Sequence, residues 1–421
     1  MPANFVPAQV PELSPPDLAG GLRYVARQPI LDARRRVHGY ELLFRAGAES
    51  VFRGEGDLAT RTMLDNTVIF GLDQMTCGLP AFVNCTTESL TGALVEVLPP
   101  SMTVLEILES LEPTQDLIAA CRKLKKIGYR FALDDFIWKP EKLPLVQLAD
   151  YVKIDFAATK KESRREQLRL LSNTTVALVA EKVETEAEQK EAVDEGFNLF
   201  QGFFFCRPVL LMGRKVPPNR LIHIQILELI QQEPLHLRQL AELVKRDASL
   251  TFRLLRLVNS PVCAIRQEVR SIETALVVVG EDSFRRIATL AIATELNAGQ
   301  PAEILRMAFV RGRFCELAAS LCNLNPTEQY LLGMFSLLPA MLRMPMTDLA
   351  PSLPLREPIR TALQGAATAE RTLLHWLECY EQGDWVHCDA IVQSFALNQA
   401  EIVRSYRAAV VWADTALRSV A

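Results

Sequence analysis

Between Tyr24 and residue 205, short apolar runs alternate with longer segments of helical periodicity. Repeated alternation of strand and helix is typical of an α/β architecture with a largely parallel sheet. Gly128 and Gly196 each follow a helical segment, where a left-handed residue commonly ends a helix. The expected strands are Val37–Phe44, Ala81–Cys85, Val104–Leu108, Arg130–Phe136, Tyr151–Phe156, Val176–Val183 and Leu199–Phe205, and the expected helices are Leu58–Met75, Thr114–Lys126, Ser163–Leu171 and Glu184–Glu195.

The pattern changes near residue 215. Beyond Pro208, Gly213, Pro217 and Pro218, helical segments follow one another to the end of the chain. A length of 421 residues also exceeds what one ordinary core accommodates. We therefore expect an α/β plus all-α protein with a disordered proline-rich lead-in over residues 1–22, an α/β barrel over residues 23–214 and a helical domain over residues 215–421.

Composition argues against two classes of protein. The chain has 46 Lys and Arg against 50 Asp and Glu, a formal charge of −4, which disfavours a wholly basic nucleic-acid binder. The most apolar stretch, Leu331 to Leu342, is short and contains Pro339, so we expect no membrane span. The start of the chain shows no secretory signal, and the nine cysteines form no CxxC pair. We therefore expect a cytoplasmic protein with reduced thiols.

Acidic residues lie within or directly after the expected strands. A buried parallel strand carries few charges unless they face a site, and in a TIM-like (β/α) barrel the carboxyl ends of the strands meet around one axis. Converging carboxylates repel one another, and oxygen ligands with almost no histidine favour Mg²⁺ or Mn²⁺ between them. For any single acid, capping of a helix is the alternative. The acids are Glu41, Glu106, Asp134, Asp135, Asp155 and Glu181, with Asn84 and Lys153 in equivalent positions.

The same segments resemble EAL domains, which are cyclic di-GMP phosphodiesterases. Gln28-Pro29-Ile30 and Glu41-Leu42-Leu43-Phe44-Arg45 are similar to the start of that domain, with Leu42 in place of the alanine of the signature. The resemblance extends over residues 24 to about 210. Its other motifs are Phe82-Val83-Asn84, Leu105-Glu106-Ile107-Leu108-Glu109, Leu133-Asp134-Asp135-Phe136, Val152-Lys153-Ile154-Asp155, Ala180-Glu181-Lys182-Val183-Glu184-Thr185 and Gln201-Gly202-Phe203 through Pro208.

The resemblance implies hydrolysis of cyclic di-GMP to pGpG with one or two Mg²⁺ or Mn²⁺ ions. It assigns metal ligands, catalytic residues, substrate contacts and one loop-stabilising residue. Glu181 is either a ligand of the second ion or the general base, and Lys153 either orients the attacking water or offsets charge. The implied ligands are Glu41, Asn84, Glu106, Asp134 and Asp135; the catalytic residues are Glu181, Lys153 and Asp155; the substrate contacts are Gln28, Arg45 and Gln201; and Glu109 braces the loop after Asp135.

The chain departs from the family pattern at two places. Active members have a glycine-rich loop after the Asp-Asp pair, which positions the second metal and couples a dimer to catalysis. This chain instead has Ile137-Trp138-Lys139-Pro140, and Lys182 replaces a glycine beside Glu181. Two alternatives therefore stay open: a receptor that binds cyclic di-GMP without hydrolysing it, and a protein-interaction scaffold.

The helical half resembles the HDOD domain, an all-helical relative of HD phosphohydrolases, over Asp247–Pro261, Ser271-Ile272 and Ala275–Gly280. None of its histidines is followed by Asp, so we expect it to regulate the barrel or dock a protein partner and not to hydrolyse a substrate. A homodimer is expected by resemblance. Leu237–Val258 also has helix-turn-helix spacing, with the basic residues Lys245, Arg246, Arg253 and Arg256, but the acidic chain disfavours DNA binding.

Overall fold

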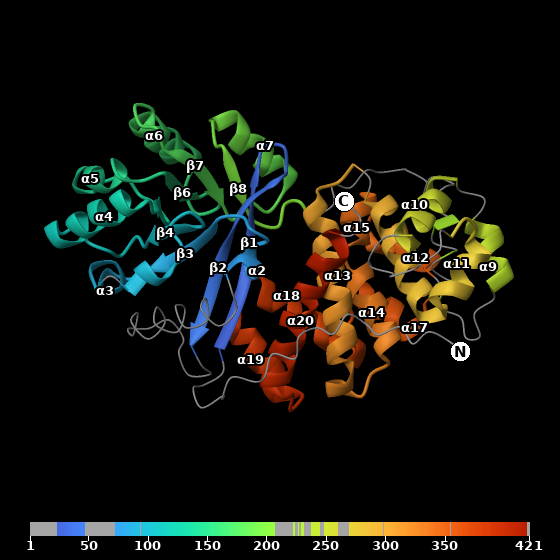
Figure 1. Cartoon of the computed structure of the whole chain (residues 1–421). Helices are drawn as coiled ribbons and strands as arrows, with labels where there is room; N and C mark the ends of the chain where they lie inside the picture. Colours follow the sequence, from blue (N-terminus) through green and yellow to red (C-terminus); the bar gives the residue numbers. More distant parts are fainter. Residues whose placement is uncertain are drawn as a thin grey trace.

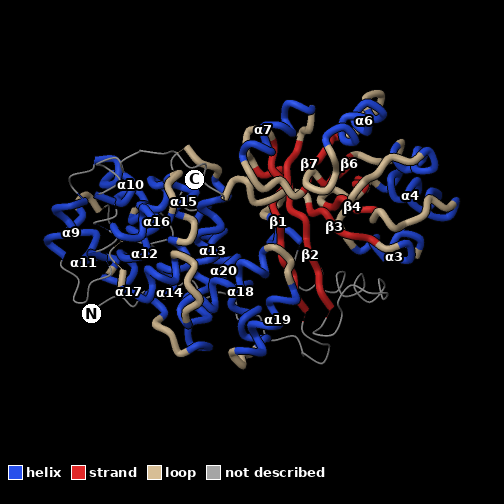
Figure 2. The backbone as a smooth tube through the Cα atoms, turned by 180° about the vertical axis from the view of Figure 1, so that it is seen from behind, coloured by secondary structure: helices blue, strands red, loops and turns tan. Residues whose placement is uncertain are grey.

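The computed structural model describes residues 23–46, 72–92, 94–206, 222–223, 226, 229–230, 237–244, 248–259, 269–297, 299–353 and 355–418. The expected lead-in, most of the helix expected over Leu58–Met75 and the domain boundary expected at 214–215 lie outside these residues. Figure 1 shows a β/α barrel beside a helical assembly. The same division is clear from behind in Figure 2, where the described strands lie together in one half.

Eight strands close into a barrel in sequence order. The first strand pairs antiparallel with its two neighbours, and the other pairs are parallel. This confirms the predicted barrel, but the sequence pattern missed β1, whose Arg27, Gln28 and Pro29 interrupt its apolar residues. The strands are β1 (Arg23–Asp32), β2 (Val37–Ala46), β3 (Ala81–Cys85), β4 (Thr103–Ile107), β5 (Arg130–Leu133), β6 (Tyr151–Asp155), β7 (Ala177–Glu181) and β8 (Leu199–Gln201).

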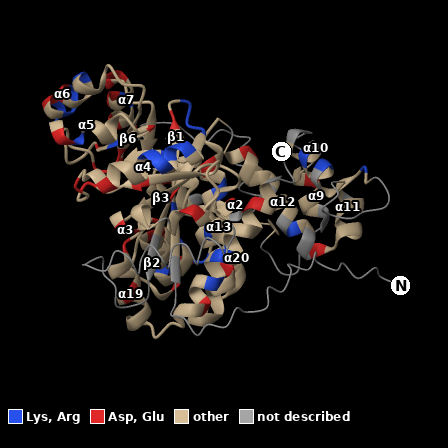
Figure 3. Ribbon diagram, turned by 60° about the vertical axis from the view of Figure 1, so that its left-hand side comes forward, with Lys and Arg blue, Asp and Glu red and all other residues tan. Residues whose placement is uncertain are grey.

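Helices on the outside of the barrel begin and end at local signals in the sequence. Gly128 and Gly196 adopt the predicted left-handed conformation, with φ of 110° and 101°. Thr185 and Glu188 form a capping box at the start of α7. Figure 3 shows acidic and basic residues interspersed on α6 and α7, as expected for solvated faces. The helices are α2 (Leu72–Thr76), α3 (Thr87–Thr91), η1 (Leu94–Val97), α4 (Gln115–Ile127), η2 (Pro140–Lys142), α5 (Leu143–Val146), α6 (Lys161–Leu171) and α7 (Glu186–Glu195).

The second half is helical throughout its described residues, as predicted. No described helix combines the length and the apolar character needed to cross a membrane. Arg253 of α10 pairs with Glu295 of α12 at 2.5 Å, while Lys245 and Arg246 lie outside the described residues. The elements are α9 (Leu237–Val244), α10 (Ala248–Val258), α11 (Ile272–Val279), α12 (Glu281–Leu296), α13 (Ala302–Ala318), η4 (Ala319–Cys322), α14 (Pro326–Phe335), α15 (Leu338–Leu342), α16 (Met346–Leu349), η5 (Ala350–Ser352), α17 (Glu357–Leu363), η6 (Ala369–Arg371), α18 (Thr372–Glu381), α19 (Trp385–Ser394) and α20 (Gln399–Arg418).

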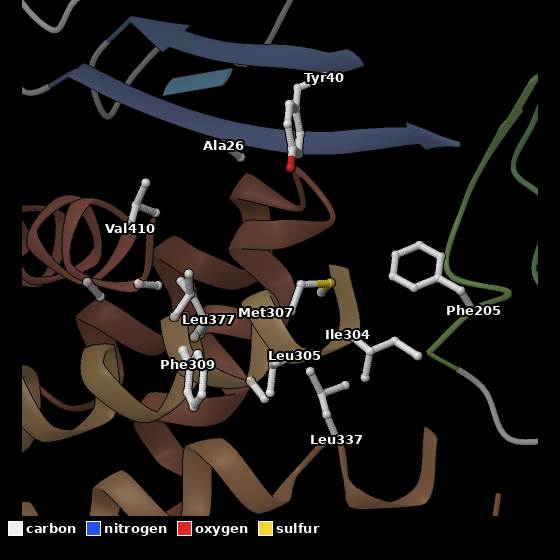
Figure 4. Packing of buried hydrophobic residues seen from close by; sticks show 14 of the residues in the cluster. Ala26, Tyr40, Phe205, Ile304, Leu305, Met307, Phe309, Leu337, Leu377 and Val410 are labelled. Atoms are coloured by element: carbon white, nitrogen blue, oxygen red, sulfur yellow. The ribbon is translucent and has the colours of Figure 1, made fainter. Parts of the chain in front are cut away.

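The two halves meet where the β1–β2 hairpin lies against helices α13, α18 and α20. Figure 4 shows Ala26 and Tyr40 facing these helices, with Ile304 and Met307 of α13 near the contact. The Tyr40 hydroxyl donates to Glu303 Oε2 at 2.9 Å, and the Val25 amide donates to the Tyr380 hydroxyl at 3.0 Å. Because successive side chains of a strand point to opposite faces, Tyr40 contacts the helices while Glu41 faces the barrel interior.

Buried charges surround the Tyr40 ring. The guanidinium groups of Arg27 and Arg306 lie over the ring, 5.2 and 5.4 Å from its centroid. Arg306 also pairs with Glu303 at 3.2 Å and with Asp414 of α20 at 2.7 Å. Removing one partner from a buried network of this kind strongly destabilises the fold, because the remaining charge is left buried with neither a counter-charge nor water to solvate it.

Glu303 should make the stability of the protein depend on pH. Its burial raises the pKa of Glu303 from its usual value of 4.5 to about 7, although the Arg27 charge and the Tyr40 hydrogen bond act in the opposite direction. The folded chain then retains a proton that the unfolded chain releases. This group therefore lowers the free energy of unfolding, by up to about 3 kcal/mol, as the pH rises from about 4.5 to about 7.

Glu303→Gln removes this titration, so its free energy of unfolding relative to the wild type should increase across that pH window by a similar amount. Urea unfolding at a series of pH values measures the difference. The exposed Glu162→Gln serves as the matched control and should give a curve parallel to the wild type. A Glu303→Gln curve that also stays parallel would contradict the raised pKa.

Candidate active site

Four of the predicted acids converge on one buried lysine at the carboxyl ends of the strands, here called the barrel mouth. The ammonium of Lys153, on β6, has no exposed surface and lies among carboxylates from β2, β4, β7 and the segment directly after β5. The strand register helps to bring these carboxylates together, because Cα partners on neighbouring strands lie at the same height along the barrel axis. The distances from Lys153 Nζ are 3.0 Å to Glu41, 2.8 Å to Glu106, 2.8 Å to Asp134 and 2.7 Å to Glu181.

One ammonium does not balance four carboxylates. Burial, reinforced by the neighbouring Glu41, raises the pKa of Glu106 well above its usual range. Burial likewise raises the pKa of Glu181 to about 8, although Lys153 opposes this rise. Burial alone would lower the pKa of Lys153, but the carboxylates, Glu106 first among them, raise it well above its usual value. The crowded carboxyls therefore tend to keep protons, and a further cation would take the place of those protons.

Amide side chains complete the inner wall of the barrel mouth. Gln201 Nε2 donates to Glu41 Oε2 at 2.6 Å and to Gln28 Oε1 at 2.8 Å. Asn84 Nδ2 donates to Glu41 Oε1 at 3.2 Å. Within the described part of the chain, the buried oxygens Asn84 Oδ1, Gln201 Oε1 and Glu106 Oε2 have no hydrogen-bond partner. Buried oxygen acceptors without donors are the chemistry that a hard divalent cation satisfies.

The carboxylates are arranged around the lysine and not around an open ion position. Among the described residues, no group of three or more His, Cys, Asp or Glu side chains has a geometry ready to hold a metal ion. Lys153 Nζ occupies the point on which four carboxylates converge. The residues therefore fit a divalent cation in their chemistry, and binding one requires the ammonium to move aside.

Asp135 and Asp155 form a separate group with Lys182. Lys182 Nζ lies 2.5 Å from Asp155 Oδ2 and 3.8 Å from Asp135 Oδ1. The Ala158 amide also donates to Asp155, at 2.7 Å. Burial opposes ionisation of Asp155, yet the Lys182 hydrogen bond and the backbone amides lower the pKa of this carboxyl. The predicted site residues are thus divided between an inner group around Lys153 and an outer group around Lys182.

The loop after Asp135 is fixed by aromatic packing. Phe136 is buried, and its amide donates to the Lys153 carbonyl at 2.8 Å. The Trp138 ring meets the Phe136 ring edge-on at 6.3 Å, and the Trp138 amide donates to Gln167 at 3.2 Å. Side chains therefore immobilise this loop in place of the glycine-rich sequence that the family pattern predicted here.

The contacts predicted for Glu109 and Arg45 do not appear among the described residues. Glu109 is exposed, and its backbone carbonyl accepts from Lys142 Nζ at 3.4 Å, so its role as a brace stays a prediction. The Arg45 side chain lies outside the described residues. Sequence reasoning did not anticipate the pairing of Lys182 with Asp155; the signal that could have indicated it was a lysine at a glycine position.

Comparison with known proteins follows the division seen in the fold. The profile of the EAL domain matches residues 82–208, and that of the HDOD domain matches residues 216–351. Cyclic di-GMP phosphodiesterase CdgJ of Vibrio cholerae is 36% identical over 372 residues, which are 86% of this chain and 85% of CdgJ. The chain belongs to the EAL–HDOD family. YuxH, an uncharacterized protein of Bacillus subtilis, is 32% identical to this EAL–HDOD protein over 400 residues, 92% of this chain and 97% of YuxH.

A solved structure of BlrP1 from Klebsiella pneumoniae, a calcium and cy-diGMP complex, is 24% identical with a TM-score of 0.37, over 44% of this chain and 55% of that one. Within this EAL–HDOD protein, the EAL profile includes most of the residues of the barrel mouth. Gln28, Glu41 and Arg45 precede the matched segment. The strand register nevertheless places Gln28 opposite Glu41, and Glu41 is ion-paired with Lys153.

Proposed function

We propose that this EAL–HDOD protein is a divalent-cation-dependent phosphodiesterase that hydrolyses cyclic di-GMP to pGpG. The convergence of Glu41, Glu106, Asp134 and Glu181 at the barrel mouth carries the proposal. The chain aligns over most of its length with cyclic di-GMP phosphodiesterase CdgJ, and this similarity supports cyclic di-GMP as the substrate.

The cofactor in this proposal is Mg²⁺ or Mn²⁺. Glu41, Asn84, Glu106 and Asp134 would hold one ion, and the partnerless buried oxygens of Asn84 and Glu106 support this assignment. A site with two ions would use Asp134, Asp135 and Glu181 for the second one, whereas a site with one ion leaves Glu181 free to accept a proton. A bound cation of this kind polarises a phosphate oxygen and lowers the pKa of a bound water.

Catalysis in this proposal uses Glu181 as the proton acceptor. Glu181 lies at the barrel mouth, 2.7 Å from Lys153 Nζ, and a bound cation would favour its ionised form, which can accept a proton. Lys153 offsets the charge of the surrounding carboxylates, and Asp155 supports the outer group around Lys182. Gln28, Gln201 and Arg45 would bind the substrate, with the guanidinium of Arg45 suited to a phosphate oxygen.

Regulation by the HDOD domain is the second part of the proposal. Tyr40 and Arg27 contact α13 and α20, and each precedes a residue of the barrel mouth, Glu41 and Gln28 respectively. A protein partner would dock on the helical half, where Val277 and Val278 of α11 are exposed. A homodimer, which the family resemblance supports, and a cytoplasmic location, which the described cysteines support because none of them forms a disulfide, complete the proposal.

Incubation of the purified protein with cyclic di-GMP and Mn²⁺, with pGpG followed by chromatography, tests the proposal. Glu41→Ala should lower turnover by more than about 100-fold, because loss of a direct ligand exceeds the usual effect of losing its supporting residues. The exposed Glu162→Ala is the control and should retain turnover.

A parallel equilibrium binding measurement separates the alternatives. Cyclic di-GMP binding without product would replace the hydrolase with a receptor, which the position of Lys153 at the centre of the carboxylates favours as the second candidate. Neither binding nor turnover would leave a protein-interaction scaffold.

A further inference from the structure

We propose that the ammonium of Lys182 takes the place of a second divalent cation at the barrel mouth. The chain would then bind one divalent ion fewer than it would with glycine at this position. The inference rests on the proposed function, because both concern the same site, but it predicts a difference in metal stoichiometry that hydrolysis does not require.

The position of Lys182 gives it access to carboxylates that Lys153 does not pair with. It follows β7 directly, and Asp155 at the end of β6 is the Cα partner of Glu181. The Lys182 side chain therefore lies across the two strand ends, 2.5 Å from Asp155 Oδ2 and 3.8 Å from Asp135 Oδ1. A metal ion bound to Asp135 on this side would compete with the ammonium for space and for carboxylate oxygens.

The backbone of Lys182 is strained at this position beside Asp155. Lys182 has a φ of 54°, and Asp135, which it approaches, has a φ of 41°. A residue other than glycine in this left-handed region costs about 1 kcal/mol or more unless the surrounding structure compensates. The ion pair with Asp155 offers that compensation, whereas glycine would adopt the same conformation without strain.

The two lysines divide the charge of the barrel mouth between them. Lys153 pairs with Glu41, Glu106, Asp134 and Glu181, and Lys182 pairs with Asp135 and Asp155. The Lys182 side chain is 58% exposed, whereas that of Lys153 is fully buried. Removing the Lys182 charge should therefore leave the fold intact and uncover carboxylates on the solvent side, where a hydrated cation can enter.

Calorimetric titration of the full chain with Mn²⁺ tests the inference by counting ions per chain. Lys182→Gly and Lys182→Met should each bind one more Mn²⁺ than the wild type. The methionine variant retains most of the side-chain volume and removes only the charge, so it separates charge from backbone freedom. Lys139→Met removes an exposed lysine of the loop after Asp135 and should bind as many ions as the wild type.

The outcomes distinguish this inference from the proposed function. Equal stoichiometry in the wild type and both Lys182 variants would overturn the inference and leave a hydrolase whose wild-type turnover is measured separately. A gain in Lys182→Gly alone would also overturn it, because backbone freedom and not charge would then be the cause. Absence of Mn²⁺ binding from every variant would remove the cation-dependent hydrolase as well.

Discussion

Lys153→Met should lower the free energy of unfolding by about 3–5 kcal/mol, the range observed when one partner of a buried ion pair is removed. The lysine has no exposed surface and lies within 3.0 Å of four carboxylates, so its loss leaves those groups facing one another without a counter-charge. Excess Mn²⁺ should restore much of the lost stability, because the vacated position is surrounded by oxygen ligands. Urea unfolding with EDTA and with Mn²⁺ measures both effects.

Lys139→Met is the matched control for this experiment. Its lysine is exposed, so its removal should change the free energy of unfolding far less and leave the effect of Mn²⁺ as in the wild type. The deficit of Lys153→Met should also shrink as the pH falls, since the facing carboxylates then take up protons in the folded state. A deficit that neither Mn²⁺ nor acid reduces would contradict the view that Lys153 acts through its charge.

Glu181→Gln should lower turnover of cyclic di-GMP by about 100-fold or more, the usual contribution of a positioned general base. The amide has nearly the shape of the carboxyl and can still accept from Lys153, so nucleotide affinity should change by less than about threefold. Single-turnover formation of pGpG gives the first quantity, and equilibrium dialysis of the nucleotide gives the second.

The exposed Asp194→Asn, on α7, controls for removal of a nearby charge and should leave both quantities close to wild type. Retained turnover in Glu181→Gln would exclude this residue as the base. An equal loss of affinity and turnover would instead assign it to substrate binding.

The barrel and the gathering of its acids could be predicted because both depend on local pattern and simple geometry. Strand ends in a closed barrel must meet, so a Glu or Asp at each end is brought to one place whatever the side chains do there. That reasoning placed Glu106, Asp134 and Glu181 together correctly. It also placed Asp155 with them, but the side chain turns to Lys182 instead.

The remaining features depend on side-chain reach and on distant contacts. The strand positions predicted Lys153 at the barrel mouth, with charge compensation as one of its two possible roles, but not that its ammonium contacts four carboxylates at once. The hydrogen bond between Tyr40 and Glu303 joins residues 263 positions apart, which periodicity cannot detect. The first strand escaped prediction because polar residues and Pro29 hide a strand that pairs antiparallel.

Consecutive residues of β2 contact different parts of the molecule, Tyr40 the helical domain and Glu41 the barrel mouth. In the proposed regulation by the HDOD domain, the two sites would therefore be linked by a single peptide unit. A shift of α13 that displaces Tyr40 must also displace Glu41, without any relay of intermediate side chains. The same coupling operates in reverse, since a ligand that reorients Glu41 changes what the helices contact. Under the proposed function, a variant without hydrolysis would therefore still report nucleotide occupancy to the helical domain.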